Sequence, residues 1–158
     1  MIQRIQSVYL LLAIAIGISM FFLPFASITS GASVGSFKVL HLLDISVYEN
    51  DIIKTSTGIY LPAILTTVFI TIALVIVFSY KNRKMQIMMC KLNMLLLALL
   101  IALIFYQVDM LSYGSDAITK PIYHAGTYLP VIALILLYMS LKAIIKDDAL
   151  IKSADRLR

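Results

Sequence analysis

The stretch KNRKMQIMMCK, residues 81–91, separates two apolar segments of the chain. These segments, 59–80 and 92–108, are long enough, or nearly so, to cross the ~30 Å hydrocarbon core as helices that rise ~1.5 Å per residue. Short loops rich in Lys and Arg stay on the cytoplasmic side of a membrane. We therefore expect the stretch to be a cytoplasmic loop that fixes the orientation of the chain through its basic residues, Lys81, Arg83, Lys84 and Lys91.

The composition indicates an integral membrane protein. Of 158 residues, 61% are hydrophobic and 13% are charged, and the mean hydropathy is +0.98. Soluble domains are about 45–50% apolar and about 25% charged. The net charge of +5 lies mostly beside apolar segments, which is typical of membrane topology, so we expect no nucleic-acid partner. The single cysteine, Cys90, excludes an internal disulfide and a zinc site built from cysteines.

The apolar segments predict an all-α integral membrane fold, a bundle of four transmembrane helices in a single domain, residues 1–158. The first segment also resembles the apolar region of a signal peptide. It is longer than the usual stretch of roughly 7–15 residues and has no clean cleavage site, so we expect it to remain as a span. Turn-forming and β-branched residues predict one or two short strands in the first outer loop. The predicted spans are about 8–25, 59–80, 92–108 and 128–145, the outer loops are 27–57 and 109–127, and the cytoplasmic loop and tail are 81–91 and 146–158.

Lys and Arg are distributed unequally between the two sides of this topology. Of 13 such residues, Lys38, Lys54 and Lys120 fall on the outer side, which leaves 13 − 3 = 10 on the inner side. Because the cytoplasmic side collects Lys and Arg, we expect both chain ends to be cytoplasmic.

A short motif, G-x-Y-L-P, occurs at the start of the second and of the fourth predicted span. Glycine permits a turn, tyrosine anchors at the membrane interface and proline suits the first helical turn. The repetition favours two similar helical hairpins related by an axis along the membrane normal, although such a device could also arise twice independently. The repeated positions are Gly58, Tyr60 and Pro62 in the first copy and Gly126, Tyr128 and Pro130 in the second.

Few residues within the spans can carry chemistry. Ionisable residues inside a membrane point to transport or catalysis, and the middle of each predicted span has none; Lys142 lies three residues before the end of the fourth. Hydroxyls at helical positions usually bond a backbone carbonyl or a neighbouring helix, which is a packing role. A small-solute channel or carrier would instead need a water-accessible path along Thr66, Thr67 and Thr71.

Two histidines on different outer loops, His41 and His124, are weak candidates for a metal site. They lack the H-x-x-x-H or H-E-x-x-H spacing of metal-binding helices, and hydrogen-bonded histidines are the commoner interpretation. No Ser-His-Asp order, P-loop or glycine-rich fingerprint is present. We therefore expect no catalytic residue and no cofactor, and an enzyme only if these histidines bind a metal.

The tail KDDALIKSADRLR predicts a short amphipathic helix. Asp147 or Asp148 can cap its start. The helix would either continue the fourth span at the lipid surface or dock a cytoplasmic partner. Its predicted apolar stripe is Leu150, Ile151, Ala154 and Leu157, and the charged residues beside it are Lys152, Asp155, Arg156 and Arg158.

Both ends of the chain resemble those of a known family. The opening MIQRIQSVYLLLA and the ending DDALIKSADRLR are similar to a bacterial family of small four-span membrane proteins of unknown function, domain of unknown function 4293. The resemblance implies an inner-membrane location and supplies no activity. Because both ends are expected to be cytoplasmic, we hypothesise that Arg4 and the tail carboxylates meet beneath the helices. The matching positions are Gln3, Arg4, Gln6 and Tyr9, then Ala149, Leu150, Ser153, Asp155, Arg156, Leu157 and Arg158; conservative departures are Asp148, Ile151 and Lys152.

The sequence thus predicts a non-enzymatic accessory or scaffold subunit. Its expected partners are the lipid bilayer and a membrane or cytoplasmic protein that docks on the cytoplasmic ends. The first alternative is a small-solute channel or carrier, and the second is a metal-dependent enzyme on the outer face.

Overall fold

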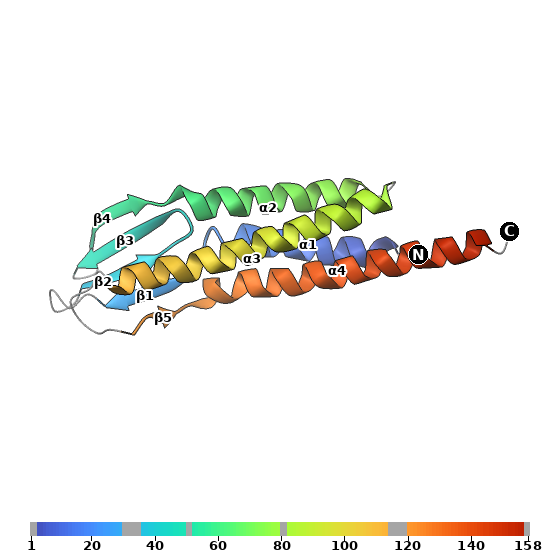
Figure 1. The fold of residues 1–158 in the computed structure, drawn as a ribbon. Helices are drawn as coiled ribbons and strands as arrows, with labels where there is room; N and C mark the ends of the chain where they lie inside the picture. Colours follow the sequence, from blue (N-terminus) through green and yellow to red (C-terminus); the bar gives the residue numbers. More distant parts are fainter. Residues whose placement is uncertain (1–2, 30–35, 50–51, 80–81, 114–119, 157–158) are drawn as a thin grey trace.

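Four helices lie side by side, and a small antiparallel sheet covers one end of them (Figure 1). The first turn of the first helix, the connection between the second and third, and the end of the fourth lie at the opposite end (Figure 1). We call these the sheet end and the basic end. The computed structural model describes residues 3–29, 36–49, 52–79, 82–113 and 120–156.

The helices pack in a ring in which α1 and α3 each contact both α2 and α4. Buried positions on every helix alternate at spacings of four and three residues, the repeat that keeps one seam of a helix facing its neighbours in left-handed packing. The helices are α1 Gln3–Ser19, α2 Tyr60–Phe78, α3 Arg83–Tyr113 and α4 Ala125–Arg156. The seams comprise Gln6, Leu10, Ala13, Gly17 and Met20 on α1; Pro62, Thr66, Phe69, Ala73 and Ile76 on α2; Gln86, Cys90, Asn93, Leu97, Leu100 and Ile104 on α3; and Gly126, Pro130, Ala133, Leu137, Ser140, Ile144 and Asp147 on α4.

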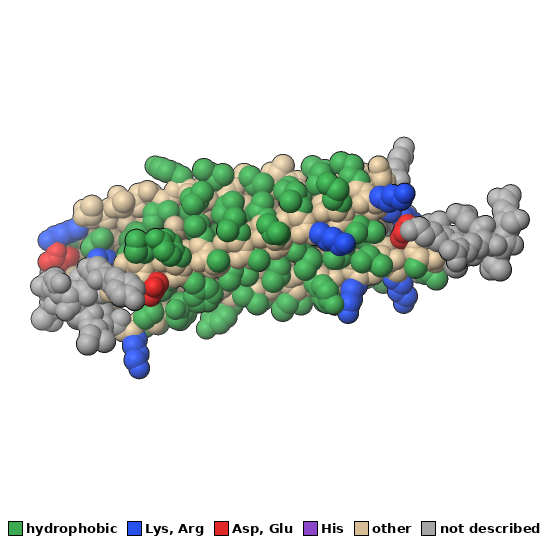
Figure 2. Space-filling model, in the orientation of Figure 1, with side chains coloured by type: hydrophobic (Ala, Val, Ile, Leu, Met, Phe, Trp, Pro, Cys, Tyr) green, Lys and Arg blue, Asp and Glu red, His purple; other side chains and the backbone are tan. Residues whose placement is uncertain are grey.

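The outer surface of the helices is apolar. Figure 2 shows hydrophobic side chains over the middle of the visible face, with Lys and Arg towards the two ends. Leu95 is 67% exposed, and Ile64 and Ile135 are each more than half exposed. Exposed apolar side chains on this scale suit lipid and not water as the surrounding solvent. Within the described residues three helices, α2, α3 and α4, are long and apolar enough to cross a membrane, which is compatible with a membrane location.

The prediction of four equivalent spans is wrong at the first helix. Helix α1 has 17 residues, and at ~1.5 Å per residue it falls short of the ~30 Å hydrocarbon core. The predicted span 8–25 ends early because Pro24 disfavours helical geometry at the residue before it and cannot donate a backbone bond. The chain instead tightens after Ser19, where the N–H of Phe21 donates to the carbonyl of Ile18 and that of Phe22 to Ser19.

The prediction of an all-α fold is also wrong, because residues assigned to the outer loops form a five-stranded sheet. The strand order is β4-β3-β2-β1-β5, and every neighbouring pair is antiparallel. β-Branched and aromatic residues dominate these segments, and cross-strand pairs such as Phe37 and Tyr48, stacked at 4.9 Å, stabilise them. The strands are β1 Ala26–Thr29, β2 Ser36–Leu40, β3 Asp44–Glu49, β4 Ile52–Gly58 and β5 Ile122–Tyr123.

The middle of the sheet is attached to the core of the helices. Ala26, Leu40 and Leu42 are buried in the same apolar cluster as Ile104 and Val108 of α3. Helix α3 continues beyond the ends of its neighbours and contacts β1. At one edge of the sheet, by contrast, every residue of β4 is exposed. The sheet is therefore an extension of the membrane-compatible core and not a separate domain.

Three hydrogen bonds at the sheet end connect the carbonyls of Pro24 and Phe25 to residues at the start of α4, and we call this contact the joint. The carbonyl of Pro24 accepts a bond from the N–H of Gly126 at 3.1 Å, and the carbonyl of Phe25 accepts one from the N–H of His124 at 2.8 Å. The hydroxyl of Thr127 also donates to the carbonyl of Phe25. These bonds hold the α1–β1 connection against the start of α4.

The two copies of the G-x-Y-L-P motif occupy different places in their helices. Gly58 ends β4 and Pro62 is the third residue of α2, whereas Gly126 is already inside α4. Tyr60 and Tyr128 are 69% and 60% exposed at the helix starts. The motif thus places two exposed tyrosines at the sheet end, as expected for interface anchors.

The glycines of the two motifs give a matched test of the joint. A Cβ at Gly126 would overlap the carbonyl oxygen of Pro24, whereas a Cβ at Gly58 would meet the far end of the Tyr60 side chain, which can move. Gly126→Ala should lower the free energy of unfolding by about 1–3 kcal/mol, the usual range for overpacking. Gly58→Ala should change it by less than about 0.5 kcal/mol. Thermal unfolding in detergent measures both, and equal losses would contradict the joint.

The β3–β4 hairpin contains a carboxylate bonded to two hydroxyls. Ser56 donates to Oδ2 of Asp44 at 2.7 Å and Ser46 donates to the same atom at 2.8 Å. The hydrogen bond from Ser56, followed by that from Ser46 and the charge of His41, lowers the pKa of Asp44 from its ordinary 3.8 despite partial burial, which raises it. A carboxyl with a depressed pKa stabilises the fold above its ordinary pKa and loses that contribution as pH falls through the folded value.

Asp44→Asn should therefore weaken the hairpin at neutral pH. The two bonds are partly exposed, so a loss of about 1 kcal/mol, or roughly fivefold faster opening, is expected. Hydrogen exchange of the β3 and β4 amides measures this opening, as the ratio of the exchange rate in the variant to that in the wild type. The ratio should approach one as pH falls below 3.8, where the wild-type carboxylate becomes protonated. A ratio that stays constant with pH would show that the charge has no role.

Candidate docking surface at the basic end

Helix α4 is the longest element and projects past the rest of the molecule at the basic end. It has 32 residues, and in Figure 1 its last turns extend beyond the start of α1 and the α2–α3 connection. Because α4 is continuous from Ala125 to Arg156, the projection follows the axis of the helix. A helix in this position leads away from the surface of the membrane-compatible core.

The described side chains at the base of the projection combine apolar and charged groups. Leu150 is 48% exposed and Ile145 is 45% exposed. Lys146 and Ala149 are also exposed. Asp155 and Arg156 belong to the helical backbone of α4, but their side chains and those of Ile151, Lys152 and Ala154 lie outside the described part, as do the residues Leu157 and Arg158.

Three buried polar groups lie at the same end on three different helices. They are the carboxylate of Asp147 on α4, Oε1 of Gln6 on α1 and Nη1 of Arg83 on α3. None has a hydrogen-bond partner within the described structure, and Asp147 is only 7% exposed. Buried polar atoms are nearly always bonded, and leaving them unbonded costs free energy. Such positions are where a protein gives up stability for a function.

A fourth such atom, Oδ1 of Asn93, is buried farther along α3, so buried atoms without a partner among the described residues are not confined to the basic end. The other polar bonds of the seams have packing roles. The Nε2–H of Gln86 donates to the carbonyl of Ile76 at 2.9 Å, and the Nδ2–H of Asn93 donates to that of Phe69 at 3.3 Å. Both bonds tie α3 to α2. Similarly, Ser140 of α4 donates to the carbonyl of Gln6 of α1 at 3.4 Å.

The prediction of a loop over 81–91 is wrong from Arg83 onward, where α3 begins, because Lys, Met and Gln are good helix formers. Lys84 and Lys91 are exposed, and Arg83 is half-buried at the start of α3. Lys142 of α4 lies 4.8 Å from the centre of the Tyr138 ring. Lys81 lies outside the described residues, and Cys90 is buried in the seam of α3.

Arg4 lies in the first turn of α1, at the basic end with the start of the projection. Its side chain is outside the described part, so its pairing with carboxylates of the tail stays a prediction.

The threonines predicted for a channel do not face one path. Thr66 is buried and donates to the carbonyl of Pro62, whereas Thr67 and Thr71 are exposed and donate to Ala63 and Thr67 of the same helix. Each hydroxyl bonds its own backbone one turn earlier, which satisfies it without a solute or water.

The histidines lie on the sheet. His41 follows β2, and Nε2 of His124, just after β5, lies 2.9 Å from Oγ of Ser27. Both are partly buried. Across the described chain, no group of three or more His, Cys, Asp or Glu side chains is arranged to hold a metal ion.

Sequence reasoning missed Gln6, Gln86 and Asp147 as buried residues. Their spacing contained the signal, because each falls on the four-three repeat of its helix. Asp147 was instead interpreted as a cap of a separate tail helix, but α4 runs through it without interruption.

Comparison with known proteins gives one family. No curated protein matches the chain. A family model described as "Domain of unknown function (DUF4293)" matches residues 2–157, nearly the whole chain. The chain therefore belongs to this family of domains of unknown function.

Proposed function

We propose that the protein is a non-enzymatic accessory or scaffold subunit of the bacterial inner membrane that docks a protein partner on the projecting end of α4. The observation that carries this proposal is the continuous helix itself. At ~1.5 Å per residue its 32 residues span about 48 Å, which leaves about 18 Å beyond a ~30 Å hydrocarbon core.

The continuous course of α4 agrees with the expectation that the tail continues the fourth span, and we propose that the end of this helix also docks a partner. An interfacial helix lies in the plane of the membrane with its apolar face in the head groups. The end of α4 follows the axis of a membrane-compatible helix and so leaves that plane. Leu150, which is 48% exposed near the end of this helix, is an apolar side chain that a partner helix could contact.

The buried polar groups at the base of the projection support a docking role. Asp147, Gln6 and Arg83 belong to α4, α1 and α3, at the end of the molecule from which α4 projects. A small shift of α4 could give these groups new donors and acceptors. This arrangement suits a subunit that responds to its partner and not only an anchor.

We also propose that the basic end faces the cytoplasm and the sheet end faces outward. Lys84, Lys91 and Lys146 are exposed at or near the basic end, whereas on the sheet side Lys54 is paired with Glu49. An excess of Lys and Arg in short segments favours the cytoplasmic side. Both ends of the chain would then be cytoplasmic.

Cysteine labelling tests the orientation. In a Cys90→Ala background, Lys84→Cys and Lys146→Cys should react with a membrane-impermeant maleimide only after cells are permeabilised. Thr55→Cys, on exposed β4, should react in spheroplasts with an intact inner membrane. Labelling of the Lys positions in intact spheroplasts would reverse the proposed orientation.

Removal of residues 149–158 tests the docking. The amount of each protein that co-purifies with the full chain from native membranes should fall at least about tenfold, because an interface centred on a short helix depends on few contacts. The truncated chain should still insert and keep its thermal stability, since the seams end at Asp147.

A pair of substitutions controls for general damage. Leu150→Asp should reproduce the loss of partners in the full-length chain. Ile52→Asp makes the same change at a residue that is 69% exposed on the sheet, and it should have no effect. If the same proteins are recovered from the truncated and complete chains, the docking proposal is wrong.

A further inference from the structure

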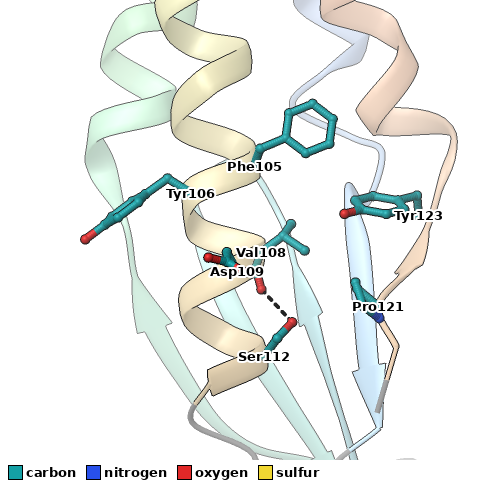
Figure 3. Close-up of a pocket in the computed structure, with 7 residues that line it drawn as sticks. All are labelled: Phe105, Tyr106, Val108, Asp109, Ser112, Pro121 and Tyr123. Carbon is teal, nitrogen blue, oxygen red and sulfur yellow. Dashed lines mark hydrogen bonds between the residues drawn. The ribbon is translucent and has the colours of Figure 1, made fainter. Parts of the chain in front are cut away.

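A groove at the sheet end lies between the last turns of α3 and the segment that forms β5 (Figure 3). Its volume is about 500 Å³. Val108 is buried beneath it, and the remaining lining side chains are at least partly exposed. They are Phe105, Tyr106, Asp109, Ser112, Pro121 and Tyr123.

Aromatic rings form much of the wall of this groove. The ring centres of Phe105 and Tyr123 are 5.9 Å apart and their planes differ by 58°. Both residues are substantially exposed, at 45% and 40%. The face of an aromatic ring attracts a cation within about 6 Å of its centre.

Among the described residues that line the groove, Asp109 is the one with a charged side chain. Asp109 is exposed on α3 and lines the groove, and no Lys or Arg is among its described lining residues. Ser112 donates its hydroxyl proton to the carbonyl of Val108 at 2.9 Å. A carboxylate beside aromatic faces suits an ammonium group, which gains from the negative charge and from the rings.

The groove lies at the level of lipid head groups. Exposed Tyr60 and Tyr128 stand at the starts of α2 and α4, and Tyr106 is 59% exposed on α3. Tyrosines at the ends of spans typically mark the interface between lipid and water. Asp109 follows Tyr106 by one helical turn towards the sheet, and so lies just on the aqueous side of that level.

We propose that this groove binds the head group of a phospholipid that carries a primary ammonium, such as phosphatidylethanolamine. The lipid would belong to the leaflet on the sheet side and would enter the open groove from the membrane. Its ammonium would meet Asp109 and the rings of Phe105 and Tyr123, while its acyl chains stay against the exposed apolar surface of the helices. The site is independent of the docking proposal, because it lies at the other end of the molecule.

A second cavity on α3 has a different chemistry. It has a volume of about 290 Å³, and the lining includes Lys38, Gln107 and Met110 but no carboxylate. A cation in the lining disfavours an ammonium ligand. The preferential binding of an ammonium group should therefore depend on the groove that contains Asp109 and not on the second cavity.

Native mass spectrometry of the full chain in detergent tests the site. The probes are phosphatidylethanolamine and phosphatidylglycerol with identical acyl chains, so that only the head groups differ. Wild type should bind the ethanolamine lipid about fivefold more tightly, as a partly exposed ion pair and cation–π contact together allow. Asp109→Asn should reduce this ratio to about one, and Tyr123→Leu should reduce it by about half.

A matched control separates the groove from general surface charge. Glu49→Gln removes a carboxylate from the same end of the molecule, where Glu49 pairs with Lys54 outside the groove, and should leave the ratio unchanged. Circular dichroism of each variant reports whether it folds. Equal binding of the two lipids to wild type would overturn the proposal, and so would a folded Asp109→Asn variant that keeps the preference.

Discussion

The structure depends on the bonds that hold the carbonyls of Pro24 and Phe25 against the start of α4. At this point the chain leaves a helix in an apolar environment, where unbonded backbone groups are expensive. Gly126 allows the close approach because it has no side chain. The same contact brings β5 beside β1, where Ser27 and Ile122 pair. One local requirement of the backbone thus determines how the sheet is joined to the helices.

The sequence predicted the apolar helices because they follow from composition and spacing over a few neighbouring residues, but the stretch predicted as the loop 81–91 is helical from Arg83. It predicted one or two short strands in the first outer loop, but not the five-stranded sheet. Strand β5 has only two residues, and it is stable only because β1, almost one hundred residues earlier, lies beside it. The early end of α1 could have been inferred from Pro24, since proline restricts the residue before it. The apolar residues Phe21 and Phe22 concealed that signal by continuing the hydrophobic pattern.

The candidate sites differ in how far the sequence could predict them. The tail of α4 could be identified as a docking candidate because its charges and apolar residues are contiguous. Gln6 and Asp147 share the end of the seams only because α1 and α4 run antiparallel, which the four-three repeat indicates but does not prove. The groove could not be predicted, because Asp109 and Tyr123 come from segments that meet only through β5. By sequence alone Asp109 is the first residue of the predicted outer loop 109–127.

The two ends of the molecule therefore differ in how their polar groups are satisfied. At the sheet end, the strands and the Pro24–Phe25 joint bond the backbone where the chain leaves the helices, so a ligand there would meet a fixed surface. At the basic end, the same packing repeat that buries Leu10 and Leu137 also buries Gln6 and Asp147, whose oxygens lack partners among the described residues. Replacing such groups by apolar residues would stabilise most proteins. Gln6 and Asp147 stand near the base of the projecting helix, so the docking that we propose and the burial of these polar groups concern the same end of the molecule.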